Sequence, residues 1–377
     1  MRAYVLPDPR LLKLAGRFVW LGIDTENPKN LSFTEKFPID AWPSLLVIDP
    51  ATEAVVVRWA GTTTAEGIEK LALDGERALG AEKTSRADGY LAEADRLLGA
   101  RAHAKAAEAY AKALDEGGKG WPGRERAAEA RVQALGMSDD PAGCAAAATA
   151  YAPTVQTSST AARIVAQGIS CALGLESAPA KKAAVAPLLP RARKLLGDRT
   201  VLADDRSWLY DVLVSAKKDE GDEPGAKALA LRWSQFLERE TRRAKTALER
   251  SAFNGQRVSA AMALGAPERV LPDLIQSEKD LPDDFAPPTL VGYVSLKLGK
   301  NAEALAAAER ALALAQGPRR IRILVLKGQA ELALDRKEAA RATFERAIAE
   351  GEALPENARP LGFMRQAKKA LDGLGGS

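Results

Sequence analysis

The sequence has very few of the residues from which most metal, redox and nucleophilic sites are built. It contains one histidine, His103, and two cysteines, Cys144 and Cys171. A single histidine excludes multi-histidine metal sites and leaves a Ser-His-Asp triad only one possible base. No Cys-x-x-Cys pair occurs, which excludes zinc fingers, iron–sulfur ligand sets and a dithiol redox motif within this chain. We therefore expect no metal and no cofactor.

Long apolar runs are also missing. No stretch of about 18 apolar residues occurs, so we expect no membrane-spanning helix. The first residues, from Met1 to Pro9, lack the apolar stretch and the cleavage site of a secretory signal. Two cysteines in a chain of this length fit a reducing compartment. The expected location is the cytoplasm.

Aromatic residues are scarce, and neither sign of charge dominates. Aromatics make up 5% of the 377 residues while hydrophobic residues make up 46%, so the apolar content is mostly Ala, Leu and Val, which favours helices packed on helices. Lys plus Arg number 54 and Asp plus Glu 50, a smaller bias than nucleic-acid binding proteins show. Two basic runs are expected to be solvated helix faces: Arg239, Arg242, Arg243 and Lys245, and Arg319, Arg320 and Arg322.

The composition changes near residue 80, which predicts two domains, 1–80 and 86–377. Trp20, Trp42 and Trp59 all precede this point. In the first part, strand patterns alternate with helix patterns. An almost continuous apolar run is typical of a buried strand, and Asp49-Pro50 marks a turn. The expected elements are helices at 11–17 and 27–37, a strand at 18–24, a hairpin of strands 44–49 and 54–59, and a helix capped by Thr64.

From residue 86 onward the pattern is helical and contains a repeated spacing. A small residue is followed 12 and 19 positions later by alanine in three units. Antiparallel helices approach closely only where small side chains face each other, and a larger residue one turn on can fill the groove between them. The repeat positions are Ala94, Ala106, Tyr110 and Ala113; Gly292, Ala304 and Ala311; and Gly328, Ala340, Phe344 and Ala347.

This spacing resembles that of the tetratricopeptide repeat (TPR), whose helical hairpins form a concave surface for peptides. The clearest units span about 86–117, 287–317 and 321–353, and the aromatic residue is replaced by Ala308 in the second unit. Between 140 and 280 the match is poor, although Gly221-Asp222 followed by Ala226 and Ala230 resembles a degenerate unit. The resemblance implies an α-helical solenoid that binds a protein or peptide partner in its concave face.

The first 75 residues resemble the distal part of a thioredoxin-like domain. The motif is a strand ending at Asp24, a helix, Trp42-Pro43 before the strand that begins at Ser44, and then a hairpin and a helix. The resemblance implies that Pro43 is a cis proline and that Trp42 and Pro43 are neighbours of a redox site. The expected fold class is α+β: an incomplete thioredoxin-like α/β domain followed by an all-α TPR-like solenoid.

The family's first strand and its Cys-x-x-Cys would precede Met1, so two functional hypotheses stay open. The first is a protein–protein interaction scaffold without redox chemistry in the chain as given, with no nucleic-acid or membrane partner. The second is a thiol–disulfide oxidoreductase or thiol chaperone whose Cys-x-x-Cys lies upstream of Met1, with the repeats selecting clients.

The remaining candidate residues have simpler interpretations. Cys144 and Cys171 are either two small buried residues or a disulfide between neighbouring helices. His103 falls at a turn between repeat helices, where a solvated or capping role is expected. Asp283-Asp284-Phe285 is expected to be a loop that starts a helix rather than a pair of acid–base carboxylates.

Overall fold

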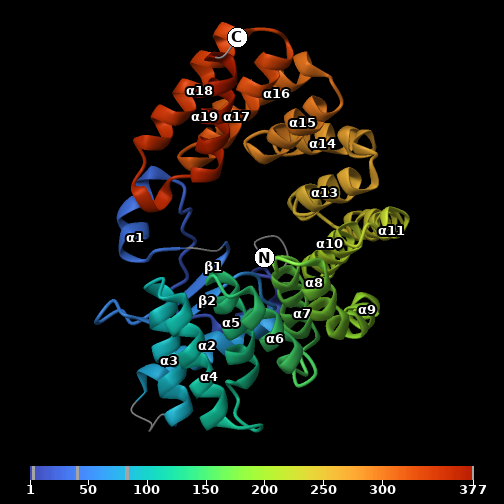
Figure 1. Ribbon diagram of the computed structural model, residues 1–377. Coiled ribbons are helices and arrows are strands. Elements are labelled where there is room, and N and C mark those ends of the chain that lie inside the picture. The colour runs from blue at the N-terminus through green and yellow to red at the C-terminus, as the bar shows by residue number, and fades with distance from the viewer. Residues whose placement is uncertain (2–4, 40–41, 81–84, 376–377) are drawn as a thin grey trace. The chain divides into compact units, whose positions relative to one another are not determined.

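The computed structural model describes residues 1, 5–39, 42–80 and 85–375 (Figure 1). The chain divides into two compact units, and its path passes from one to the other more than once. The first unit contains Met1–Trp20 and Pro38–Trp233, and the second contains Leu21–Phe37 and Ser234–Ser377. Most of the predicted joint at residues 80–85 lies outside the described residues, so the domains 1–80 and 86–377 stay a prediction.

The first unit combines short N-terminal elements with a helical array. Its helices and strands are η1 (Pro9–Leu14), β1 (Ser44–Ile48), β2 (Val55–Ala60), α2 (Ala65–Leu79), α3 (Arg86–Gly99), α4 (His103–Gly117), α5 (Arg124–Met137), α6 (Pro141–Tyr151), α7 (Ser158–Leu173), α8 (Ala178–Val185), η3 (Ala186–Leu188), α9 (Leu189–Gly197) and α10 (Ala203–Asp219). Helix α11 (Glu223–Arg243) begins in this unit and ends in the second.

The described residues of the second unit form helices joined by loops and include no strand. Its elements are η2 (Pro28–Asn30), α1 (Leu31–Lys36), α12 (Ala247–Ser251), α13 (Asn254–Leu264), η4 (Pro267–Val270), α14 (Leu271–Asp280), α15 (Ala286–Lys297), α16 (Asn301–Leu314), α17 (Pro318–Ala333), α18 (Lys337–Glu352), η5 (Glu356–Ala358) and α19 (Leu361–Gly375). Helix α15 begins at Ala286, two residues after Asp284, whose side chain accepts from the N–H of Ala286 at 2.9 Å. The prediction that this acidic pair starts a helix agrees with the structure.

Four helical hairpins share one turn geometry. Between the paired helices a residue with positive φ ends the first helix: Arg101, Gly221, Gly299 or Asp335. The N–H of the next residue then bonds to the carbonyl five residues earlier, as in Lys300 to Ser295 and Asp222 to Lys217. This arrangement satisfies the last carbonyls of the first helix and reverses the chain. The α10–α11 hairpin therefore has the turn of the clear repeats, and helical-hairpin repeats are confirmed.

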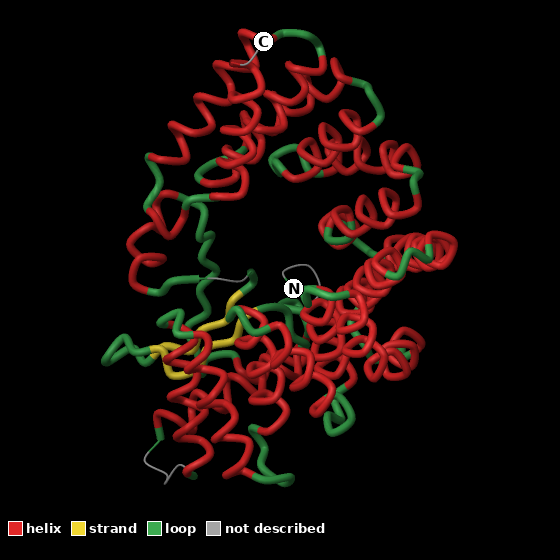
Figure 2. The backbone as a smooth tube through the Cα atoms, in the orientation of Figure 1, coloured by secondary structure: helices red, strands yellow, loops and turns green. Residues whose placement is uncertain are grey.

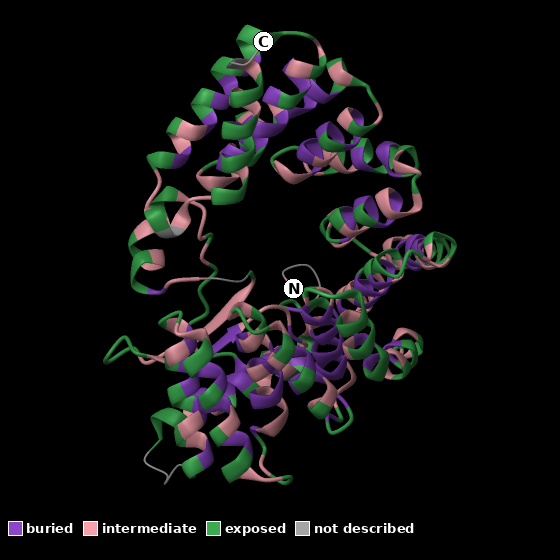
Figure 3. Cartoon of the chain, in the orientation of Figure 1, coloured by how far each residue is buried: buried purple, intermediate pink, exposed green. Residues whose placement is uncertain are grey.

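Small residues meet across these hairpins. All of the repeat alanines are fully buried, and so are Tyr110 and Phe344. A side chain on Gly328 would lie 2.6 Å from the ring of Phe344, and one on Gly292 would lie 3.1 Å from Leu326. Figure 3 shows the buried residues along the helix faces that turn toward neighbouring helices. The small-residue spacing thus produces close helix packing.

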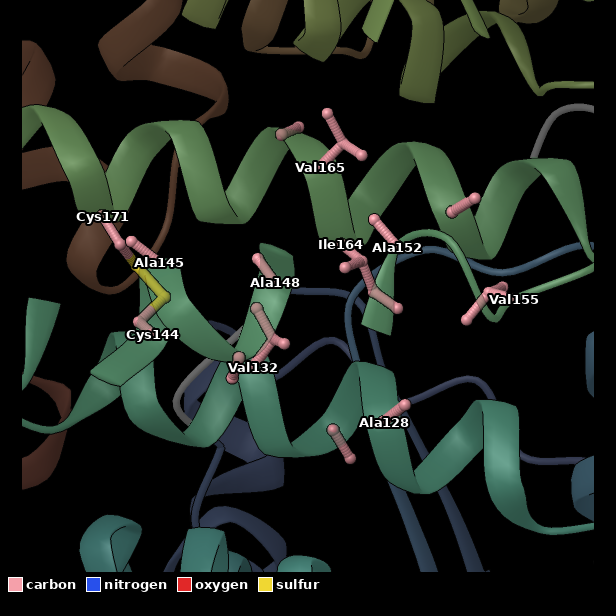
Figure 4. Packing of buried hydrophobic residues seen from close by; sticks show 14 of the residues in the cluster. Ala128, Val132, Cys144, Ala145, Ala148, Ala152, Val155, Ile164, Val165 and Cys171 are labelled. Atoms are coloured by element: carbon pink, nitrogen blue, oxygen red, sulfur yellow. A yellow bond between two sulfur atoms is a disulfide. The ribbon is translucent and has the colours of Figure 1, made fainter. Parts of the chain in front are cut away.

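The largest core of the first unit is formed by helices α3 to α10. It contains a disulfide. Cys144 of α6 is joined to Cys171 of α7, with the two Cα atoms 6.0 Å apart (Figure 4). Ala145 lies beside the bond, and Ala148 and Val165 belong to the same core of mostly alanine and β-branched residues. The sequence left open whether Cys144 and Cys171 are separate buried residues or form a disulfide, and the structure has the disulfide.

The predicted α+β fold class is wrong, because the described residues contain no thioredoxin-like α/β domain. Their sheet has two strands, β1 and β2, in an otherwise helical chain (Figure 2). The expected strand at 18–24 does not form. Three of its apolar side chains are exposed, Val19 by 89%, Leu21 by 74% and Trp20 by 51%. A strand requires a pairing partner and buried side chains, and this segment has neither in the structure. The chain is mainly an all-α array of TPR-like hairpins.

The other N-terminal elements match the expectations in part. The hairpin forms as an antiparallel pair in which Leu45 faces Trp59, and the Thr64 hydroxyl caps α2 by accepting from the N–H of Gly67 at 3.0 Å. The expected helix at 11–17 is the shorter 3₁₀ turn η1, and the one at 27–37 is divided into η2 and α1. Both η1 and η2 begin with a proline, Pro9 and Pro28, at the position where a helix needs no backbone N–H.

Candidate functional site

The outer edge of strand β2 is bound by side chains of the helical array. The N–H of Arg58 donates to Asp95 of α3 at 3.3 Å, and Gln133 of α5 donates to the carbonyl of Ala60 at 2.9 Å. Beyond the strand, the hydroxyl of Thr62 bonds to Asp205 of α10 at 3.4 Å. Residues 58–62 therefore bond in turn to α3, α5 and α10. The chain's own backbone occupies this face of the array.

Asp95 is the centre of one buried polar cluster. Its carboxylate is 2% exposed and accepts from the Tyr110 hydroxyl at 2.7 Å and from Arg126 of α5 at 2.8 Å, besides the Arg58 N–H. Arg126 also pairs with Asp74 of α2 at 3.1 Å. Burial and the adjacent Asp95 carboxylate raise the pKa of Tyr110 well above its usual value, so the phenol stays a hydrogen-bond donor. This cluster joins α2, α3, α4 and α5.

Arg163 of α7 is the centre of the second cluster. It makes a two-pronged pair with Glu129 of α5 and donates to Asp205 at 3.0 Å. Its guanidinium lies over the ring of Trp59, 5.8 Å from the centroid. Burial raises the pKa of both Glu129 and Asp205, and the charge of Arg163, which lowers both pKa values, does not offset it. Burial opposes the charge of Arg163, but the two carboxylates outweigh it and raise its pKa.

A cleft of about 830 Å³ opens beside these clusters in the first unit. Its apolar lining comes from Trp59, Leu71, Leu73 and Pro122, and charged residues of α2, α5 and α7 surround them. Several of these charges are paired with each other, as Lys70 is with Glu66 at 2.9 Å. An apolar floor with a charged border is typical of a surface that binds a ligand or a peptide segment.

His103, Cys144 and Cys171 all lie outside the lining of the cleft. His103 is at the first position of α4, and the disulfide leaves no free thiol among the described residues. Within the ranges that the structure describes, no group of three or more His, Cys, Asp or Glu side chains could hold a metal ion. The same residues include no helix that is both long and apolar enough to span a bilayer.

The predicted redox-site neighbours lie in the segment before β1. The Trp42–Pro43 peptide bond is cis, as the resemblance implied for Pro43, and the Trp42 side chain is 65% exposed. With the thioredoxin-like domain excluded, the resemblance no longer supports a redox role for this pair.

The two basic runs differ in the structure. Arg239, Arg242, Arg243 and Lys245 are exposed at the end of α11, as expected. Arg319 and Arg320 are half-buried instead and hold carboxylates, Arg320 pairing with Glu350 at 2.9 Å. Arg319 pairs with Asp24, far away in sequence, and no local pattern could have revealed this contact.

Comparisons with known proteins give fold-level likeness only. No family model matches the chain, and no curated protein matches it. Among solved structures, a tetratricopeptide repeat protein from Parabacteroides merdae is 13% identical, with a TM-score of 0.47 over 75% of this chain and 98% of its own. Acl4, the assembly chaperone of RpL4, is 15% identical, with a TM-score of 0.37 over 76% and 97%. The TPR2AB domain of yeast Sti1 in its pHSP90 complex is 15% identical, with a TM-score of 0.25 over 76% and 98%. Because these TM-scores are low, the assignment of TPR-like repeats rests on the hairpins of this chain.

Proposed function

We propose that this protein is a protein-interaction scaffold whose first unit binds a short segment of a partner in the cleft beside α2, α5 and α7. The cleft supports this proposal because it is open, has an apolar floor and has a charged border. A partner segment could bury side chains against Leu71 and Leu73 while its polar groups meet the border, which is the usual composition of a recognition surface.

The proposal places the partner beside the hairpin rather than along the whole concave face. Residues 58–62 already use Asp95, Gln133 and Asp205 of the array, so those groups are not free for a partner. A foreign strand along the same line would have to displace this segment together with the Trp59–Arg163 contact. The cleft needs no such displacement.

The test is peptide selection followed by a matched pair of variants. Peptides are selected from a random phage-displayed library on the full-length chain, and their affinities are measured by fluorescence anisotropy. Leu73 of α2 lines the cleft and is 36% exposed, while Leu231 of α11 is 39% exposed and does not line it. Leu73→Arg should weaken binding about tenfold or more, as loss of an interface anchor does, and Leu231→Arg should not. Equal affinity for both variants, with both still folded by thermal melt, would contradict the proposal.

A further inference from the structure

An acidic segment of the chain is bound by one arginine of the second unit. The guanidinium of Arg319, in the first turn of α17, donates from Nη1 and Nη2 to the two carboxylate oxygens of Asp24, at 3.0 and 2.8 Å. Its Nε donates to the carboxylate of Glu26. This parallel fork is the geometry in which arginine recognises a carboxylate most specifically. One arginine side chain therefore binds the carboxylates of two acidic residues that are two positions apart in the sequence.

The residues around Arg319 hold its guanidinium in position to bind the acidic segment. The ring of Phe285 lies under its guanidinium, 4.8 Å from the ring centroid, which limits the rotamers that the side chain can adopt. Gly317, just before α17, has φ of 55°, and a side chain there would overlap the carbonyl oxygen of Glu26. The glycine thus leaves room for the backbone of the acidic segment.

The acidic segment has its own compact turn, and few of its side chains are buried. The Asp24 side chain accepts from the N–H of Glu26 at 3.1 Å, and its carbonyl accepts from the side chain of Asn30 at 2.8 Å. The short helices η2 and α1 that follow contain no buried residue. Val19 and Leu21, on the other side, are largely in water. Segments with few buried apolar contacts and exposed ion pairs open locally more readily than a packed core.

We propose that Arg319, Phe285 and Gly317 form a recognition site for an Asp-x-Glu turn of a partner protein, which the chain's own Asp24-Thr25-Glu26 fills until it is displaced. The bound internal segment shows the chemistry that the site accepts: two side-chain carboxylates in one turn, with the backbone against a glycine. The site lies in the second unit and does not depend on the cleft proposed above.

The test uses the chain's own segment as the probe. A fluorescent peptide of residues 21–37 is titrated with the full-length protein by anisotropy. Asp24→Asn with Glu26→Gln, made in the protein, removes both internal charges but keeps hydrogen-bond acceptors at the turn. This double variant should bind the wild-type peptide about tenfold or more tightly than the wild-type protein does, because the internal competitor is weakened. Glu26→Gln alone should give a smaller gain in the same direction.

Controls separate this effect from general loosening of the fold. Glu35→Gln removes an exposed carboxylate of the same segment and should leave the affinity unchanged. Adding Arg319→Gln to the double variant should abolish binding, while adding Arg365→Gln, on the exposed face of α19, should not. A peptide with both acidic residues neutralised should not bind. Equal affinity for the wild-type protein and the double variant, no binding to either, or binding that survives Arg319→Gln would overturn the proposal.

Sedimentation of the full-length chain tests a second copy as the occupant. A monomer at the concentrations used for binding is expected. If the protein is a dimer that the peptide dissociates, residues 21–37 of one copy occupy the site of the other. That result would overturn recognition of a foreign partner.

Discussion

The hydroxyl of Tyr110 donates a 2.7 Å hydrogen bond to the carboxylate of Asp95, and both side chains are buried between α3 and α4. Tyr110 stands at the aromatic position of the repeat spacing, and Asp95 follows the small residue Ala94. One position of the repeat thus fills the groove between two helices and also holds the carboxylate that binds strand β2.

Tyr110→Phe should therefore destabilise the protein without removing the ring from the core. The phenylalanine keeps the packing, but Asp95 loses a buried donor, which costs about 1.5–3 kcal/mol for a hydrogen bond to a charged group. Urea unfolding measures the change in the free energy of unfolding. Tyr293→Phe, at an exposed position of α15, is the control and should have little effect. Equal losses would contradict the role of the Asp95 cluster.

Ala340→Leu tests the close packing of the last clear repeat. Ala340 is fully buried in α18, facing α17, so a larger side chain overpacks the contact and should cost roughly 1–3 kcal/mol. Lys337 lies at the start of the same helix with its side chain 58% exposed, and Lys337→Leu should change the denaturation midpoint little. Similar midpoints for the two variants would show that the assigned repeat register is wrong.

Reduction of the Cys144–Cys171 disulfide should lower the melting temperature. The bond closes a loop with a sequence separation of 27, and the chain-entropy model gives roughly 3–4 kcal/mol of stabilisation for a loop of that length. Cys144→Ala with Cys171→Ala should reproduce the loss and make the protein insensitive to reductant. Free thiols in the unreduced protein, or a melt that reductant does not change, would contradict the bond.

Asp198 should make stability depend on pH in the acid range. Hydrogen bonds from Ser158 and Thr200 lower the pKa of its carboxyl to about 2. A pKa lower in the folded state means that the stabilisation is complete above the ordinary value near 3.8 and is lost as the pH falls toward 2. Asp198→Asn should thus be less stable than wild type at pH 7, with a gap that narrows below pH 4. Asp139→Asn, at an exposed position, should show no such gap.

Residues 1–80 alone should fail to fold. Strand β2 is bound on its outer edge by Asp95 and Gln133, which the fragment lacks, and open strand edges favour aggregation. Residues 86–377 should form a helical protein that unfolds cooperatively, because each hairpin depends mainly on its neighbours. Dispersed amide signals and a sharp melt from residues 1–80 would contradict this.

The sequence by itself determined the helical hairpins and their contacts. The spacing from Gly328 to Ala340 and Phe344 joins helices that are adjacent in the chain, so the partner of each small residue is only a short distance away in sequence. The Thr64 cap and the 44–60 hairpin are local for the same reason, since side chains within a few residues satisfy the backbone groups.

Only the tertiary structure decided what the N-terminal segments do. The apolar run at 18–24 has the composition of a buried strand, but strand formation requires a partner strand, and the structure supplies none. Arg319 belongs to a basic run that reads as a solvated face, yet it binds Asp24 across a separation of 295 residues. Such contacts depend on how distant segments are brought together in the fold. Local propensity and residue spacing cannot predict which distant segments will meet.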